Sequence, residues 1–205
     1  MRVGIFGGVF NPPHLGHLVC AQEALVQLEL GAVVWVPVHE ASHRRIEADP
    51  GADARAAMCE RATAGDERFR VSRVELERPG LSYTVDTLRE LHERLPEDEL
   101  VLLVGGDEAA ALPTWREPEE ILRLALVGAV EREGRRRDEI AERLADLEGS
   151  EHVLFFTMPR VDVSSTDIRR RAGAGVPIRY LVPDGVADYI ATEGLYAASM
   201  PVGAA

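Results

Sequence analysis

The sequence predicts an α/β fold in which an open, mostly parallel sheet carries helices on both faces within a single domain. Apolar runs of strand length alternate along the chain with segments whose apolar residues recur at helical spacing. The run at 100–104 is apolar throughout, which is typical of a strand covered on both faces. A length of 205 residues suits one such domain, and no internal repeat or linker divides it.

The predicted elements follow one another in a regular order. Strands are expected at 3–6, 33–37, 69–76, 100–104, 126–130 and 153–158. Helices are expected at 18–30, 53–64, 84–95, 119–124, 140–148 and 181–196, with further ones after residues 107 and 164. Because strand, helix and strand in succession form right-handed parallel units, we expect a Rossmann-like arrangement.

The ends of several helices carry residues that favour capping. Asp53 and Thr84 are predicted N-caps, and one of the three hydroxyl side chains at 164–166 is predicted to cap the helix that follows them. Gly31 and Gly194 are predicted to end the helices before them, because glycine tolerates the left-handed conformation found at helix ends.

Charge and residue usage exclude several classes of function. The formal net charge is −12, so the surface repels nucleic acid and anionic membranes, and we expect neither as a partner. All 23 basic residues are arginine, which excludes a P-loop lysine and Schiff-base chemistry. Cys20 and Cys59 fall in predicted helices and are expected to be buried thiols. No segment resembles a secretion signal or a membrane span, so the protein is expected to be cytoplasmic.

The loop at 7–17 is rich in residues that can bind an anion or take part in catalysis. It reads G-G-V-F-N-P-P-H-L-G-H. It joins the first strand to the first helix, which is where open α/β sheets bind ligands. Gly7 and Gly8 allow positive φ angles or the close approach of an anion, and the two prolines stiffen the loop. His14 and His17 lie beside a helix N-terminus whose free N–H groups and dipole favour a polyphosphate.

The residues of this loop are also compatible with simpler roles. A Gly-Gly pair before a helix is often only a tight turn. The H-x-x-H spacing suits a metal pair, but neither an HExxH helix nor a cysteine cluster accompanies it, so we expect no metal ligands from the protein. The glycines at 4, 7 and 8 do not form the G-x-G-x-x-G fingerprint, which argues against a hydride-transferring dehydrogenase.

Two later segments also bring anion-binding chemistry to the end of a strand. Gly105, Gly106 and Asp107 follow the apolar run at 100–104, and Asp107 either accepts hydrogen bonds from ribose hydroxyls or caps the next helix. Residues 163–171 read V-S-S-T-D-I-R-R-R and place three arginines within two helical turns. They form either the basic face of a well-capped helix or a positive patch that suits a polyphosphate.

The loop at 7–17 resembles the signature of the nucleotidyltransferases that share the (T/H)xGH motif with class I aminoacyl-tRNA synthetases. Within that group, almost the whole chain resembles the bacterial nicotinate-mononucleotide adenylyltransferases. This chain has Val9 where that family usually has Thr or Ser, and Asn11 where it often has Asp. It also has Ala41 and Ser42 in place of two prolines. These departures concern the binding of ATP and leave both histidines of the signature intact.

The resemblance implies three sets of functional residues. The catalytic residues would be His14, His17 and Arg169. ATP would be bound by Gly7, Gly8, Val9, Phe10, His14, His17, His43, Arg44, Gly105, Asp107, Ser164, Ser165, Thr166 and Arg169. The acceptor would be bound by Ser82, Tyr83, Thr84, Trp115 and Arg116. Without the resemblance, a turn with an N-cap is the favoured interpretation of residues 82–84, and the resemblance reverses that preference. An aromatic face beside an arginine, as at 115–116, suits a pyridine carboxylate.

The implied reaction transfers AMP from ATP to nicotinate mononucleotide and gives nicotinate adenine dinucleotide and pyrophosphate, a step of NAD biosynthesis. Mg²⁺ would be held mainly by the ATP phosphates. The alternatives are nicotinamide mononucleotide or another phosphate acceptor, and a nucleotide-binding protein without turnover. We expect a nucleotidyltransferase domain at 1–196 and a disordered tail at 197–205. The sequence leaves open whether the chain forms homo-oligomers.

Overall fold

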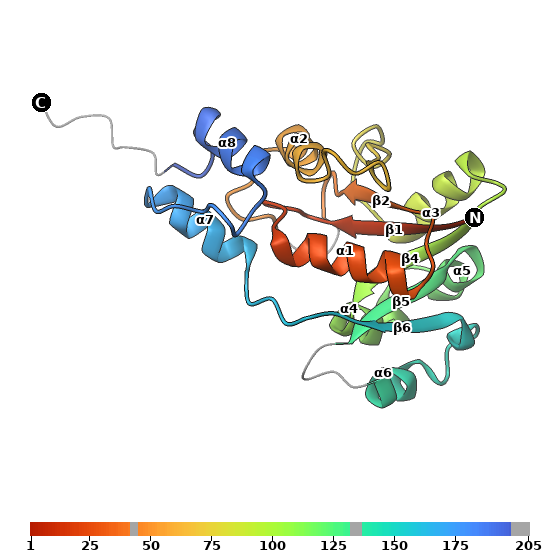
Figure 1. The fold of residues 1–205 in the computed structure, drawn as a ribbon. Helices are drawn as coiled ribbons and strands as arrows, with labels where there is room; N and C mark the ends of the chain where they lie inside the picture. The colour runs from red at the N-terminus through yellow and green to blue at the C-terminus, as the bar shows by residue number, and fades with distance from the viewer. Residues whose placement is uncertain (42–44, 132–136, 198–205) are drawn as a thin grey trace, which may run out of the picture.

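The protein is built on one six-stranded sheet, shown in Figure 1. The structure is a computed structural model and describes residues 1–41, 45–131 and 137–197. The strands are β1 (Arg2–Gly8), β2 (Ala32–Pro37), β3 (Phe69–Val71), β4 (Glu99–Gly105), β5 (Leu126–Glu131) and β6 (Val153–Thr157). They lie in the order β3-β2-β1-β4-β5-β6, and neighbouring strands pair in parallel. This is the doubly wound order of Rossmann-like folds, so the predicted fold class is confirmed.

Helices cover both faces of this sheet. They are α1 (Leu15–Gln27), α2 (Ala52–Ala62), α3 (Thr84–Arg94), α4 (Gly106–Ala111), α5 (Pro118–Leu124), α6 (Arg137–Leu144), α7 (Ser165–Gly173) and α8 (Asp184–Thr192). In β4, Leu100 and Leu102 belong to the core formed with α3, α4, α5 and α6, whereas Val101 and Leu103 pack with α1 and α2. Helices α7 and α8 share a third apolar cluster with α2, beyond the carboxyl ends of the strands (Figure 1).

The strand order determines where the predicted loops lie. β1 and β4 are paired at the centre of the sheet, and the chain leaves β1 toward β2 on one side and returns to β4 on the other. In doubly wound folds, ligands bind at this reversal of strand order, outside the carboxyl ends of the strands. The segments 7–17 and 105–107 both follow these two central strands.

The predicted C-terminal ends of α1 and β3 were wrong. Helix α1 begins at Leu15, close to its expected start near Gly16 and before the apolar periodicity that begins at Leu18, because His14 caps it. It ends before Glu29, which takes the positive φ of 53° that was expected of Gly31. Strand β3 has 3 residues instead of extending to 76, because the chain turns after it and the Glu77 N–H donates to the carbonyl at position 73 at 3.0 Å.

Two of the three predicted N-caps were also wrong. Gly51 and Tyr83 occupy the N-cap positions of α2 and α3, so Asp53 and Thr84 lie inside the first turns. The Asp53 carboxylate is engaged by an arginine at position 73 instead, at 2.8 Å. The prediction for α7 is confirmed, because Ser164 caps it and its Oγ accepts a hydrogen bond from the N–H at position 167 at 3.1 Å.

The two cysteines are buried free thiols, as predicted, and burial raises the pKa of Cys59. Within the described part of the chain, none of the helices is both long enough and apolar enough to cross a membrane. The tail predicted at 197–205 lies outside the described residues from 198 onward.

Candidate active site

The loop after β1 is shaped by a buried aromatic side chain. Phe10 has a φ of 50°, and its ring packs against Phe6 and Trp35 with centroid distances of 5.5 and 4.9 Å. A Cβ atom on Gly8 would lie 3.0 Å from the Phe10 ring, so a larger residue there would displace it. A Cβ atom on Gly7 would meet nothing within 4 Å. Gly7 therefore borders open space, and the left-handed conformation predicted for the glycines falls on Phe10 instead.

His14 caps helix α1, and the His17 side chain completes the capping box by bonding back to the His14 backbone. Nδ1 of His14 accepts a hydrogen bond from the Gly16 N–H, and Nδ1 of His17 accepts one from the His14 N–H, each at 3.1 Å. The two rings lie 3.8 Å apart between centroids. Because Nδ1 is the acceptor in both rings, the proton of each neutral imidazole is on Nε2. The capping arrangement thus holds both histidines as Nε2–H donors.

The backbone of the first turn of α1 is already hydrogen bonded, contrary to the prediction of free N–H groups. The Leu15 N–H donates to the Leu181 carbonyl at 3.0 Å, and the His17 N–H donates to the His14 carbonyl at 2.9 Å. The N–H of Gly16 is used by the His14 ring. An anion at this helix end therefore meets the positive end of the dipole and the histidine side chains rather than free backbone donors.

Helix α7 is fastened to the same loop although it lies far along the chain. The Ser165 hydroxyl donates to the Pro12 carbonyl at 2.8 Å. Arg169 Nη1 donates to the Asn11 carbonyl, also at 2.8 Å. The structure thus brings the first and the third predicted phosphate-binding segments into direct contact.

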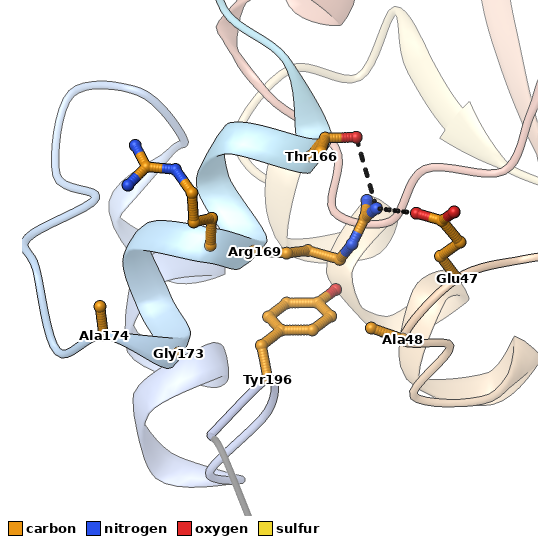
Figure 2. Close-up of a pocket in the computed structure, with 8 residues that line it drawn as sticks. Glu47, Ala48, Thr166, Arg169, Gly173, Ala174 and Tyr196 are labelled. Atoms are coloured by element: carbon orange, nitrogen blue, oxygen red, sulfur yellow. Dashed lines mark hydrogen bonds and ion pairs between the residues drawn. The ribbon is translucent and has the colours of Figure 1, made fainter.

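The Arg169 side chain lines a cavity of about 450 Å³, shown in Figure 2. Its Nη2 atom lies 3.4 Å from Thr166 Oγ1 and 3.7 Å from a Glu47 carboxylate oxygen. The Tyr196 ring lies beside the guanidinium, and its hydroxyl donates to Asn11 Oδ1 at 2.6 Å. Burial raises the pKa of Tyr196, so this hydroxyl remains a donor at neutral pH. Tyr196, near the C-terminus, therefore also anchors the loop after β1, in addition to Ser165 and Arg169.

The three arginines of α7 make different contacts. The Arg169 side chain is 13% exposed and faces the loop after β1. Arg170 pairs with Asp167 of its own helix at 2.6 Å. Arg171 donates to the Pro177 carbonyl at 2.9 Å. Of the positive patch predicted at this helix, Arg169 is the arginine whose contacts reach the loop.

The second glycine segment lies at the carboxyl end of β4. Gly105 ends the strand and is the N-cap of α4, with no side-chain hydrogen bond at that cap. Asp107 is exposed in the first turn of α4, so it does not cap the helix. Because β4 pairs in parallel with β1, the carboxyl ends of the two strands lie at the same edge of the sheet.

The predicted acceptor residues come together from two segments. The Arg116 guanidinium lies over the Tyr83 ring, 4.7 Å from its centroid. Trp115 and Tyr83 are both partly buried against the apolar cluster on the face of the sheet covered by α3 to α6. The contact between Arg116 and Tyr83 therefore brings the segments 82–84 and 115–116 together, with a cation over one aromatic face.

A buried carboxyl group lies behind this neighbourhood. Glu75 is 7% exposed, and its Oε1 accepts a hydrogen bond from the Thr87 hydroxyl at 2.7 Å. Its Oε2 is buried without a hydrogen-bond partner among the described groups. Burial raises the pKa of Glu75, although the hydrogen bond from Thr87 and the charge of Arg78 act in the opposite direction.

The positions predicted at His43 and Arg44 lie outside the described residues. Two residues that contact the loop after β1 were missed at the sequence level, Tyr196 and Arg55. A signal for Arg55 was available, because it shares the buried face of α2 with Met58 and a charged residue is unexpected in such a stripe. The sequence pattern carried no comparable signal for Tyr196.

Comparison with known proteins establishes the family. Residues 5–171 match the model of the cytidylyltransferase-like family. A relative from Corynebacterium kroppenstedtii, named probable nicotinate-nucleotide adenylyltransferase, is 44% identical over 99% of this chain and 94% of its own length. A relative of the same name from Herpetosiphon aurantiacus is 40% identical over 96% of this chain and 99% of its own length. The chain belongs to the nicotinate-nucleotide adenylyltransferase family.

Solved structures named nicotinic acid mononucleotide adenylyltransferase share the fold of this chain. The Plasmodium falciparum nicotinic acid mononucleotide adenylyltransferase complexed with NaAD has a TM-score of 0.74 at 17% identity, over 95% of this chain and 97% of that chain. The same protein complexed with APC has a TM-score of 0.73 at 16% identity. At these identities the likeness shows the fold alone. The family match itself runs from β1 into α7, so it includes the loops after β1 and β4 and the first turns of α7.

Proposed function

We propose that this chain transfers AMP from ATP to nicotinate mononucleotide and forms nicotinate adenine dinucleotide and pyrophosphate. The observation that carries the proposal is that relatives named for this activity match nearly the whole chain at 40% identity or more. The arrangement of 7–17, 105–107 and 164–169 around the carboxyl ends of the strands supports it, because ligands of doubly wound folds bind there. The proposed nucleotidyltransferase domain is 1–196.

The reaction needs no covalent intermediate on the enzyme. A phosphate oxygen of the mononucleotide attacks the α-phosphorus of ATP and forms the new P–O bond. The bond from that phosphorus to the bridging oxygen breaks, and pyrophosphate leaves with the bonding electrons. Because the acceptor phosphate is already a nucleophile, catalysis depends on positioning the two substrates and on stabilising the negative charge.

On the ATP side, His14 and His17 are proposed as paired Nε2–H donors to phosphate oxygens beside Gly7. Arg169 adds a permanent positive charge from α7, held close to the loop by its hydrogen bond to Asn11. These donors are oriented before substrate binds, which is the condition for efficient charge stabilisation. Further ATP contacts are proposed for Gly8, Val9, Phe10, Gly105, Asp107, Ser164, Ser165 and Thr166.

On the acceptor side, Trp115 and Tyr83 are proposed to contact the pyridine ring, since aromatic faces suit stacking. Arg116 lies against Tyr83 and is proposed to favour the negatively charged nicotinate group over the neutral amide. Ser82 and Thr84 complete the proposed acceptor contacts.

Mg²⁺ fits this site as an ion carried by the ATP phosphates. In the part of the chain that the structure describes, no group of three or more His, Cys, Asp or Glu side chains is arranged to hold a metal ion. Mg²⁺ commonly takes most of its ligands from substrate phosphates and water. When bound in this way, it would neutralise charge on the departing pyrophosphate. The chain's own contribution is the set of histidine and arginine donors.

Pyrophosphate release tests the proposal. The purified chain is mixed with ATP, Mg²⁺ and nicotinate mononucleotide, and pyrophosphate and dinucleotide are quantified together. We expect both products in equal amounts, and no pyrophosphate when the mononucleotide is omitted. Binding of ATP without pyrophosphate release would overturn the proposal in favour of a nucleotide-binding protein.

A further inference from the structure

Arg55 is a fully buried arginine on α2, with 0% of its side chain exposed. Nη1 donates to the Val9 carbonyl at 3.1 Å and to the Val38 carbonyl at 2.7 Å, and Nη2 donates to the His39 carbonyl at 3.1 Å. Nε donates to the Asp49 carboxylate at 2.9 Å. The three carbonyl groups belong to the loops that follow β1 and β2, so one guanidinium group ties these two loops together.

The loop after β2 is tied in turn to the acceptor segment. The His39 N–H donates to Ser82 Oγ at 3.2 Å, and the Ser82 N–H donates to the Glu40 carbonyl at 2.8 Å. Ala41 pairs with Ser82 in an isolated parallel bridge. A continuous series of contacts therefore runs from Val9 beside the proposed ATP phosphates, through Arg55 and the loop after β2, to the start of the acceptor segment.

The chemistry of arginine suits such a role. A guanidinium group taken out of water must replace its lost hydration with hydrogen bonds, or burial destabilises the fold. Its N–H groups form a planar fork with fixed angles, so the groups that it bonds are held at fixed separations. In Arg55, Nη1 bonds the carbonyl groups of Val9 and Val38 and Nη2 bonds that of His39, so one planar group sets the distance between the two loops. Lysine keeps the positive charge but has no fork.

We propose that Arg55 is a positioning residue that sets the register between the ATP loop and the acceptor segment. The inference rests on the proposed function, because that reaction joins the α-phosphate of ATP, held at the ATP loop, to the phosphate of a mononucleotide held by the acceptor segment. Arg55 is not proposed to contact either substrate and acts through the carbonyl groups of Val9, Val38 and His39. A misplacement of about 1 Å between reacting groups can slow a reaction by roughly 10²-fold, so the register affects the chemical step.

The variant Arg55→Lys tests the inference, with Arg61→Lys as its matched control. Arg61 lies on the same helix, is exposed, and covers the Tyr189 ring at 4.1 Å. For Arg55→Lys we expect kcat to fall roughly 10²-fold, while KM for each substrate changes by about threefold or less because each pocket keeps its residues. Arg61→Lys should keep the wild-type kcat. A folded Arg55→Lys with unchanged kcat, or a loss confined to KM, would overturn the inference.

Ser82→Ala provides a second test if Arg55→Lys does not fold. It removes the acceptor of the His39 N–H and leaves the buried arginine in place. Because Ser82 is also a proposed acceptor contact, kcat and KM separate its two roles. The register role predicts a kcat about tenfold lower, with KM for the mononucleotide within about threefold of the wild type, and a change confined to that KM would overturn the inference. A folded double variant that carries Arg55→Lys and Ser82→Ala should have the same kcat as Arg55→Lys alone, because both changes interrupt the same series of contacts. Wild-type kcat in Ser82→Ala, or losses that multiply in the double variant, would overturn the inference. No turnover by the wild-type chain would contradict the proposed function instead, whereas turnover retained by Arg55→Lys contradicts this inference alone.

Discussion

The two sides of the proposed site are held by different kinds of contact. On the ATP side, the loop at 7–17 receives hydrogen bonds from Ser165, Arg169 and Tyr196, and those of Ser165 and Arg169 end on backbone carbonyl groups. On the acceptor side, the Arg116 side chain is 53% exposed and lies 3.7 Å from Asp86 and 3.6 Å from a second carboxylate at position 117. The loop on the ATP side is fixed by partly buried directional bonds, whereas the charged side chain on the acceptor side makes exposed ion pairs.

This difference has a physical consequence. Exposed ion pairs contribute little to stability and are screened by salt, whereas hydrogen bonds inside a protein are directional and hold a geometry. The side proposed to stabilise the transferred phosphate is thus held by the more directional contacts. We therefore expect substitutions of the proposed phosphate donors to lower kcat, and substitutions of Trp115 and Arg116 to raise KM for the mononucleotide.

The largest effect is expected from His17. Replacing it with alanine removes an oriented donor and should lower kcat by roughly 10²-fold to 10³-fold, on the scale of comparable electrostatic stabilisers. His17→Glu separates chemistry from capping, because glutamate at this helix position can still complete a capping box but has no N–H to donate to a phosphate. It should retain the thermal stability of the wild type and lose turnover. His92→Ala, at an exposed position on α3, serves as the control. Near-normal turnover by folded His17→Glu would remove His17 from its proposed role.

The next effect separates two neighbouring arginines of α7. Arg169→Ala should lower kcat by roughly 10²-fold, because it removes a positive charge held against the loop after β1. Arg170→Ala removes the same charge from a side chain paired with Asp167 and should change kcat by about twofold or less. Steady-state pyrophosphate release measures both. Equal losses in the two variants would mean that only the net charge of the helix matters.

A smaller effect is expected on the acceptor side. Trp115→Ala should raise KM for the mononucleotide by about tenfold, since it removes a stacking face, and should leave KM for ATP unchanged. Trp115→Phe keeps part of that face and should lie between alanine and the wild type. If Trp115→Ala lowered kcat and left KM for the mononucleotide unchanged, the proposed contrast between the two sides would be wrong.

Glu75 gives the acceptor side a pH-dependent stability. Burial raises its pKa above the ordinary value of 4.5, so the folded chain binds this proton more tightly than the unfolded chain. The unfolding free energy therefore falls as pH rises from 4.5 through the raised pKa, and the contribution is fully present below that window. Glu75→Gln cannot ionise and should exceed the wild type in stability by about 1 kcal/mol at pH 8. Denaturant unfolding at pH 4 and pH 8 measures this; an equal pH dependence in both proteins would contradict it.

The part of the fold that sequence patterns predicted correctly is the part buried on both faces. A continuous apolar run such as that of β4 is compatible with few structures and predicted a strand covered on both faces; β4 lies between β1 and β5 in the sheet. Helix starts were less predictable, because a capping side chain can be drawn to another partner. Asp53 illustrates this, since its carboxylate pairs with an arginine outside the helix.

The candidate site could be located from the sequence where composition alone is unusual, as in the loop at 7–17 with three glycines, two prolines and two histidines. The supports of that loop were not predictable. Arg55 bonds carbonyl groups on two separate loops, and Tyr196 reaches an asparagine 185 positions away. Periodicity reports which face of a helix is buried. It does not report which backbone oxygen a buried polar group will meet.

The acceptor is the central claim, and direct competition tests it. Nicotinate and nicotinamide mononucleotides are supplied at equal concentration with ATP and Mg²⁺, and the dinucleotide products are separated by mass. We predict that nicotinate adenine dinucleotide dominates, because Arg116 and the aromatic faces beside it favour the charged ring substituent. A predominance of the nicotinamide product, or the absence of both dinucleotides, would contradict the account.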